Sequence, residues 1–166
     1  MCYKLKLFTV PIGFKYISEL MVKEDILIGA EESGGIGIKG HLPERDGVFN
    51  GLLFCEMLAA RKSKLSELIK QIENKYGKFY YKRIDKHLQS NEQKDSLLKE
   101  SFLIKEVAGL KVIGQDTLDG CKLKFKEGWL LVRASGTEPL LRLYSETYET
   151  NLTEEILSDI TKKFNI

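Results

Sequence analysis

The chain has 166 residues, enough for one domain or two small ones, and its 43% apolar and 30% charged residues are ordinary for a protein with a packed core. A net charge of +2 argues against a partner recognised by charge alone, such as nucleic acid or an acidic membrane surface. No apolar run is long enough to span a bilayer, and the amino terminus lacks the apolar segment of a signal peptide. Because Cys2, Cys55 and Cys121 are far apart and odd in number, we expect reduced thiols in a cytoplasmic protein.

The first 35 residues predict a strand, a helix and a second strand. Residues 5–10 are mostly apolar, residues 13–21 carry apolar side chains at helical spacing, and residues 25–29 contain the apolar run Ile26-Leu27-Ile28. This order is typical of a βαβ unit, which implies a parallel sheet. Ligands of such sheets bind beyond the carboxyl ends of the strands, and the polar loop 31–35 follows the second strand at that place.

This loop has the sequence E-E-S-G-G, in which Glu31 and Ser33 are suited to binding hydroxyl groups. A carboxylate accepts hydrogen bonds from adjacent hydroxyls, and a serine both donates and accepts. The same five residues are equally typical of an acidic surface turn. The G-x-G-x-x-G pattern at residues 35–40 does not indicate a dinucleotide site, because no helix follows it, and we interpret it as a loop or short hairpin.

Two helices are predicted next, over residues 48–60 and 63–76, with Asp46 as the N-cap of the first and Gly77 beyond the end of the second. In the second helix we expect four apolar side chains to point inward: Leu65, Leu68, Ile69 and Ile72.

From residue 78 onward the pattern changes to that of an α+β domain. Three strands, at residues 121–126, 129–132 and 140–144, are predicted to form an antiparallel meander with helices on one face. The other elements predicted here are a strand from Phe79 to Ile84, a helix from Glu92 to Leu103 and a last helix from Thr153.

The loop between the last two strands, residues 133–139, has the chemistry of an anion site. The guanidinium of Arg133 can hold phosphate oxygens with two parallel hydrogen bonds, and Arg142 lies just beyond the turn. Ser135 and Thr137 add hydroxyl donors, and Gly136 lets backbone N–H groups approach a ligand. A polar turn with a surface arginine is the alternative interpretation.

The run R-A-S-G-T-E-P followed by L-L-R-L-Y resembles the phosphate-binding loop in the last domain of the α-D-phosphohexomutases, the phosphoglucomutase and phosphomannomutase family. The E-E-S-G-G run resembles the sugar-binding loop G-E-x-S-G of the third domain, with Ala30 in place of the first glycine. The resemblance implies a catalytic role near the transferring phosphoryl group for Lys15. It implies sugar binding by Glu31, Ser33, His41 and Arg45, and phosphate binding by Arg133, Ser135, Gly136, Thr137 and Arg142.

By this resemblance, residues 1–77 are an α/β remnant, the C-terminal part of the third domain, and residues 78–166 are the fourth domain. Members of the family are isomerases that transfer a phosphoryl group from a phosphoserine in the first domain to a hexose phosphate, with Mg²⁺ held in the second. The chain contains neither a T-A-S-H-N-P-like serine loop nor a D-G-D-x-D-R metal loop. We therefore expect a recognition part that holds no cofactor, is inactive alone, and works with missing N-terminal domains of a Mg²⁺-dependent parent enzyme.

Two other functions are weighed against this one. The chain could be a stand-alone phosphosugar-binding module without catalysis. It could also bind nucleic acid through Lys122, Lys124 and Lys126, but a solvated strand face explains these lysines better, and no nucleic-acid-binding motif accompanies them. The sequence does not distinguish glucose, mannose and glucosamine phosphates as ligands.

Overall fold

The computed structural model describes residues 5–166. The chain divides into two compact units, Met1–Gln71 and Ile72–Ile166. Within residues 5–166, no helix has the length and apolar character needed to cross a membrane.

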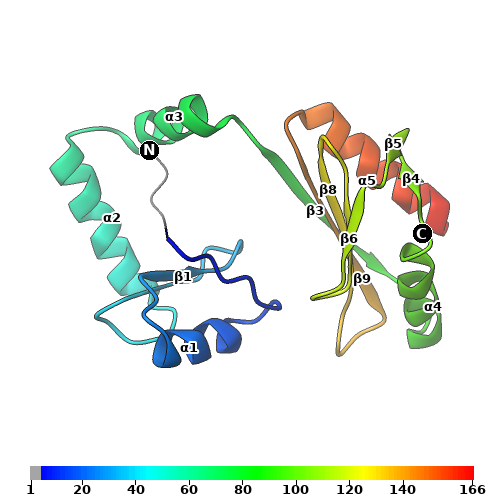
Figure 1. Cartoon of the computed structure of the whole chain (residues 1–166), viewed down its shortest axis with the longest axis horizontal. Helices are drawn as coiled ribbons and strands as arrows, with labels where there is room; N and C mark the ends of the chain where they lie inside the picture. Colours follow the sequence, from blue (N-terminus) through cyan, green and yellow to red (C-terminus); the bar gives the residue numbers. More distant parts are fainter. Residues whose placement is uncertain (1–4) are drawn as a thin grey trace. The chain divides into compact units, whose positions relative to one another are not determined.

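The first unit is built on a helix packed against a short β-hairpin. Strands β1 and β2 pair antiparallel, with Ala30 opposite Ile36, so that the predicted sugar loop is the hairpin turn. A side chain on Gly29 would collide with Ile17 of helix α1, and one on Gly37 would lie 2.9 Å from Met21 Sδ. The two glycines therefore allow helix and hairpin to approach closely. The elements are α1 (Phe14–Lys23), β1 (Ile28–Ala30), β2 (Ile36–Ile38), α2 (Gly47–Arg61) and α3 (Leu65–Tyr76), which continues into the second unit (Figure 1).

Two expectations for this region are wrong in detail. Residues 5–10 form no strand, and β1 pairs with β2 rather than with a parallel neighbour, so the βαβ unit is not closed. A strand needs a hydrogen-bonded partner, and here the adjacent glycine-rich segment supplies it locally. The predicted inward face of α3 is also largely exposed within residues 5–166, at 44% for Leu65, 47% for Ile69 and 59% for Ile72, whereas Leu68 is half-buried.

The start of α2 agrees with the sequence. Asp46 has extended backbone angles, and its Oδ1 accepts a hydrogen bond of 2.9 Å from the N–H of Phe49. This bond satisfies one of the amide groups that the first turn of a helix leaves unpaired.

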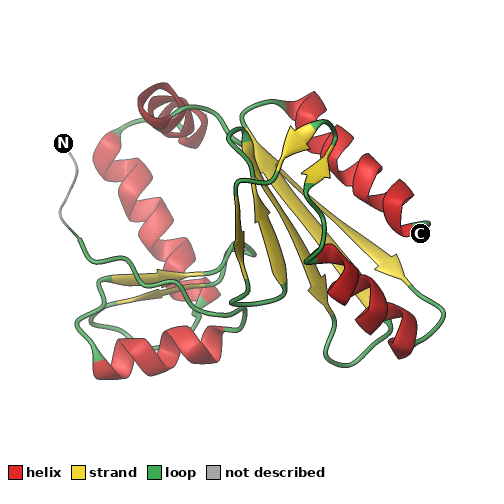
Figure 2. Ribbon diagram, turned by 45° about the vertical axis from the view of Figure 1, so that its right-hand side comes forward, coloured by secondary structure: helices red, strands yellow, loops and turns green. Residues whose placement is uncertain are grey.

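The second unit is a five-stranded antiparallel sheet in the order β3-β9-β8-β7-β6, with α4 and α5 on one face (Figure 2). The predicted meander of three strands and the helix-covered face are confirmed. A small hairpin of β4 and β5 lies outside this sheet. The bounds are β3 (Tyr80–His87), α4 (Asn91–Ser101), β4 (Glu106–Val107), β5 (Leu110–Lys111), β6 (Gly114–Asp116), β7 (Cys121–Lys124), β8 (Gly128–Ala134), β9 (Leu140–Thr147) and α5 (Thr150–Phe164).

Strand alternation gives this sheet two different faces. On the helix side, Val132 of β8 lies opposite Leu143 of β9, and both side chains are completely buried. One residue further along, Arg133 lies opposite Arg142, and their side chains therefore project from the other face. The core beneath the helices is formed by Leu97, Val107, Cys121, Leu123, Phe125, Leu130, Val132, Leu141, Leu143, Ile156, Leu157, Ile160 and Phe164.

Candidate functional site

The two arginines of the predicted phosphate loop are direct cross-strand neighbours. Arg133 ends β8, Arg142 begins β9, and the loop 135–139 joins the two strands beside them. Directly opposite residues on one face of an antiparallel pair have Cβ atoms about 5 Å apart, close enough for both guanidinium groups to reach one anion. The register therefore places Arg142 on the same face as Arg133.

Arg133 is held by an acidic residue from the preceding turn. Its Nε lies 3.1 Å from Oδ2 of Asp119, and the Arg133 side chain is 18% exposed. Gly120 has φ +97°, and a side chain on it would collide with the carbonyl of Val132, so only glycine lets this turn pass close to β8.

Arg142 is placed beside a second acidic residue. Asp85 of β3 lies opposite it, with 3.8 Å between Asp85 Oδ2 and Arg142 Nε. Asp85 also accepts two hydrogen bonds of 2.6 Å from Arg83, which hold the pKa of its carboxyl below the usual value, with a smaller contribution from the charge of Arg142. Arg142 Nε is buried and makes no hydrogen bond within residues 5–166.

The loop itself is fixed at both ends and open in the middle. The Ser135 N–H donates to the carbonyl of Leu140 at 2.8 Å, and the carbonyl of Pro139 accepts from Leu88 at 2.8 Å. Gly136 and Thr137 are exposed. In the part of the chain that the structure describes, the N–H groups of Gly136 and Glu138 have no hydrogen-bond partner. The loop therefore offers two free backbone donors next to two arginines.

In the first unit the structure brings Glu31 and Arg45 together. Glu31 closes the hairpin turn by donating its N–H to the Gly35 carbonyl at 2.9 Å, and its carboxylate Oε2 lies 3.4 Å from Nη1 of Arg45. The Glu31 side chain is only 11% exposed, whereas Ser33 is exposed at the tip of the turn. A side chain on Gly35 would lie 2.6 Å from Arg45 Cδ, so this glycine makes room for the pair.

His41 is directed toward the start of α2 rather than toward Glu31. Its Nε2 lies 2.9 Å from Asp46 Oδ2, and its ring stacks on Phe49 with 4.0 Å between centroids. The hydrogen bond from the Phe49 N–H, followed by that from His41, lowers the pKa of Asp46. The interaction of His41 with Asp46, at the helix N-cap, fixes its ring orientation.

Lys15 is the second residue of α1 and is exposed. Its Nζ lies 4.7 Å from the ring centroid of Tyr16. Among residues 5–71, no hydrogen bond or ion pair joins Lys15 to the other predicted site residues of the first unit.

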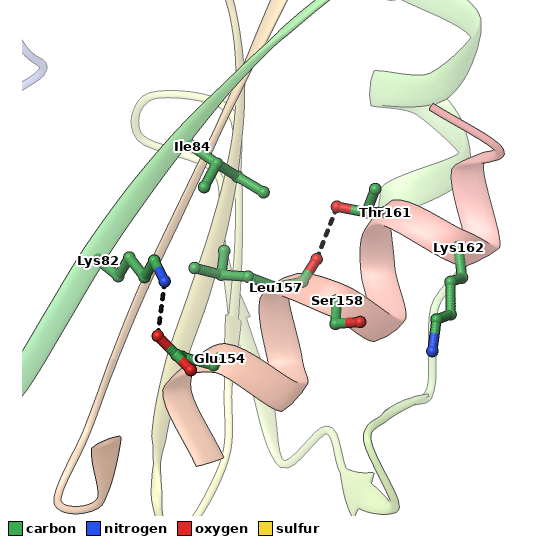
Figure 3. A pocket seen from close by; sticks show the side chains of 7 residues that line it. All are labelled: Lys82, Ile84, Glu154, Leu157, Ser158, Thr161 and Lys162. Carbon is green, nitrogen blue, oxygen red and sulfur yellow. Dashed lines mark hydrogen bonds and ion pairs between the residues drawn. The ribbon is translucent and has the colours of Figure 1, made fainter. Parts of the chain in front are cut away.

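A separate groove of about 340 Å³ lies between β3 and α5 (Figure 3). Lys82 Nζ of β3 donates across it to Glu154 Oε1 of α5 at 2.6 Å, and within α5 the Thr161 hydroxyl donates to the Leu157 carbonyl at 2.7 Å. The groove therefore lies along the line where the edge strand meets the helix. Within residues 5–166, no cluster of three or more His, Cys, Asp or Glu side chains could hold a metal ion.

The sequence motifs missed Asp85 and Asp119. Asp119-Gly120 is a turn signal, but nothing local in the sequence places that turn beside Arg133. Asp85 lies in a strand whose alternating pattern indicates only that one face is exposed to solvent. Its position opposite Arg142 depends on the pairing of two strands whose residues are 57 positions apart in the chain (142 − 85).

Comparison with known proteins defines the class. Residues 2–76 match the description "Phosphoglucomutase/phosphomannomutase, alpha/beta/alpha domain III", and residues 82–163 match "Phosphoglucomutase/phosphomannomutase, C-terminal domain". The chain belongs to the phosphoglucomutase/phosphomannomutase family, which confirms the resemblance of its two loops.

Individual relatives agree with this assignment. The chain is 30% identical over 152 residues to a phosphoglucomutase/phosphomannomutase of Thermococcus kodakarensis, covering 92% of this chain and 31% of the relative. It is 30% identical to a phosphoglucosamine mutase of Carboxydothermus hydrogenoformans, covering 94% and 31%. The crystal structure of a putative phosphomannomutase from Thermus thermophilus superposes with a TM-score of 0.74 at 37% identity, covering 94% and 30%. The chain thus spans a little under a third of the length of these relatives.

Proposed function

We propose that this chain is the substrate-recognition part of a phosphohexomutase that interconverts hexose 1-phosphates and 6-phosphates through a phosphoserine and a bisphosphate intermediate. In this proposal Arg133 and Arg142 bind the phosphate that is not being transferred, and Glu31 and Ser33 bind the sugar hydroxyls. The observation that carries the proposal is the cross-strand pairing of Arg133 with Arg142 beside a loop with free N–H groups.

Charge and donor geometry support the phosphate site. A phosphate monoester carries close to two negative charges at neutral pH, and two adjacent guanidinium groups with backbone N–H donors match its oxygens. Asp119 and Asp85 neutralise the two arginines when no anion is bound, because like charges held side by side would otherwise repel. Phosphate would replace Asp119 as the main partner of Arg133, and Ser135, Gly136 and Thr137 would supply the remaining donors.

The hairpin turn of the first unit supports the sugar site. Arg45 holds the Glu31 carboxylate in place, which leaves its other lone pairs to accept hydrogen bonds from hydroxyls. Ser33 at the exposed tip would make a further contact, and Arg45 and His41 would line the same ligand. Lys15 is proposed, from its motif, to act near the transferring phosphoryl group.

Separating recognition from chemistry has a physical rationale. Binding energy from the distant phosphate can orient the reacting end of the sugar, which raises the rate of a step performed elsewhere. Other domains of the parent enzyme would provide the phosphoserine and bind the Mg²⁺ that stabilises charge on the transferring group. The residues described here do not form a cluster that fits Mg²⁺, so no metal-dependent step is assigned to them. The free thiols of Cys55 and Cys121 are consistent with a cytoplasmic parent enzyme.

The proposal is tested by calorimetric titration of the purified chain with glucose 6-phosphate, using glucose as the control ligand. We expect saturable binding of the phosphate ester alone. Arg133→Ala should weaken it by at least about tenfold, because one charged hydrogen bond contributes about 1.5–3 kcal/mol. Arg61→Ala, which removes an exposed arginine at the end of α2, should leave it unchanged. Equal affinities for the two variants would overturn the role of Arg133.

A second assay tests the division of labour. Incubating the purified chain with glucose 1-phosphate and Mg²⁺ should yield no glucose 6-phosphate above the uncatalysed background, measured with a coupled dehydrogenase. Turnover that co-purifies with the chain and disappears in Arg133→Ala would show that catalysis also resides in these residues.

A further inference from the structure

A buried lysine lies directly behind the phosphate loop. Lys94, in the first turn of α4, is 7% exposed, and its Nζ donates to the carbonyl of Ser135 at 2.9 Å and to that of Glu138 at 3.4 Å. Its third contact is Asn91 Oδ1, at 2.8 Å. Three acceptors match the three hydrogens of an ammonium group. Lysine is rarely buried, since removing its charge from water is costly unless every donor is satisfied.

From this arrangement we infer that Lys94 is a positioning residue that holds the loop 135–139 in the conformation that binds phosphate. The inference rests on the proposed function, because it assigns Lys94 a role in the same site. Lys94 itself would not touch the ligand, and it would act through the two carbonyls that it binds.

Peptide geometry links these carbonyls to the anion. In a trans peptide the C=O and N–H point in opposite directions, so fixing the Ser135 carbonyl toward Lys94 turns the Gly136 N–H away from it. The Gly136 N–H is one of the donors without a partner among the described residues. The Glu138 carbonyl belongs to the peptide of Pro139, which has no N–H, so turning that carbonyl inward removes no donor from the ligand side.

The charge of Lys94 also distinguishes it from the two arginines. Arg133 and Arg142 each lie within ion-pair distance of an aspartate, whereas all three partners of Lys94 are neutral oxygens. No carboxylate within residues 5–166 forms an ion pair with Lys94. The loop therefore has an uncompensated positive charge behind it, and this charge favours an anion in front.

If Lys94 had a purely structural role, it would stabilise the second unit without changing the affinity for phosphate. The test therefore needs one measurement of binding and one of the local structure of the loop. We would compare the wild-type chain with Lys94→Met, which keeps the apolar stem and removes the donors. The matched control is Lys99→Met on the exposed side of the same helix. Each protein is titrated with glucose 6-phosphate at a temperature where circular dichroism shows it folded, and amide spectra are recorded for Gly136.

Lys94→Met should weaken binding by about tenfold and shift the Gly136 amide resonance and speed its exchange, whereas Lys99→Met should stay within about twofold of wild type. Should Lys94→Met not fold, Lys94→Gln, which keeps one amide donor group, should show a smaller loss in the same direction.

Three results would overturn the inference. Unchanged affinity in a folded Lys94 variant shows that the lysine does not serve the site, even if the loop moves. An unchanged Gly136 amide shows that it does not position the loop. Absence of binding by the wild-type chain refutes the proposed phosphate site, and the inference with it, and this result is distinguishable because it appears before any substitution is made.

Discussion

The two units of this chain differ in how well their apolar side chains are covered. In the second unit the sheet and two helices enclose a continuous core, with Leu130, Leu141 and Leu143 completely buried. In the first unit, Phe14 is the only apolar side chain that is buried among residues 5–71. By contrast, the side chains of Leu7 and Val48 are 88% and 79% exposed. Apolar periodicity identifies the face of a helix or strand that can be buried. Whether that face is buried depends on another element packing against it. The candidate phosphate site therefore lies on a unit with a buried apolar core, and the candidate sugar site lies on a unit whose apolar side chains are mostly exposed.

The largest expected difference is in local opening. Because buried apolar area supplies most of the stabilisation, amides of β8 and β9 should exchange with solvent roughly 1,000-fold more slowly than amides of α1 and α2. Hydrogen–deuterium exchange followed by mass spectrometry measures both units in one sample. Similar protection in the two units would show that the exposed apolar faces of the first unit are covered in solution.

The next effect concerns a single leucine in each unit. Leu143→Ala should lower the free energy of unfolding of the second unit by about 2–5 kcal/mol, the usual effect of truncating a buried leucine. Leu52→Ala, at a position that is 65% exposed on α2, should change the free energy of unfolding of the first unit by less than about 0.5 kcal/mol. Trp129, the only tryptophan, lies in β8, so its fluorescence in urea reports on the second unit, and amide exchange of α2 reports on the first. A comparable loss in both variants would contradict the burial described here.

A smaller effect is expected from the acidic partner of Arg133. Asp119→Asn removes a carboxylate that competes with phosphate, so affinity for glucose 6-phosphate should rise about threefold, consistent with a partly exposed ion pair worth less than about 1 kcal/mol. Asp95→Asn, an exposed position on α4, makes the same change in net charge and should have no effect. Weaker binding by Asp119→Asn would show instead that Asp119 orients the guanidinium for the ligand.

The smallest effect is on acid stability. The folded-state pKa of Asp85 lies below its unfolded value because of the hydrogen bonds from Arg83. Its contribution is therefore fully present above the unfolded pKa of about 4 and is lost as pH falls through the lower folded pKa. Since Asp85 is one-third exposed, we expect less than about 1 kcal/mol. Urea unfolding at pH 7 and pH 3 should show a smaller pH-dependent loss for Asp85→Asn than for wild type, with equal losses contradicting the assignment.

The same contrast explains what the sequence could predict. Four strands of the second unit, β3, β7, β8 and β9, were predictable because alternation is a local signal and Gly128 and Gly120 mark turns, whereas the short strands β4, β5 and β6 were not predicted. The strand predicted at residues 5–10 is absent, because whether an apolar run becomes a strand depends on a partner that the local pattern does not reveal. The sequence places Arg142 just beyond the turn but does not say which face of the sheet its side chain is on, and the register Arg133↔Arg142 puts the two on one face.

The residues that support the site, such as Lys94, were the hardest to predict from the sequence. A lysine near the start of a polar helix normally lies in water, and only the packing of α4 against β8 buries Lys94 beneath the loop. Motifs report which side chains a ligand needs, whereas the residues that hold those side chains come from any part of the chain that the fold brings near.

The most direct measurement is a crystal structure of the chain with glucose 6-phosphate. We predict phosphate density beside the loop 135–139, with oxygens about 2.8 Å from the guanidinium nitrogens of Arg133 and Arg142 and from the Gly136 nitrogen. A loop without ligand at saturating concentration, with Arg133 still bound to Asp119, would contradict the account.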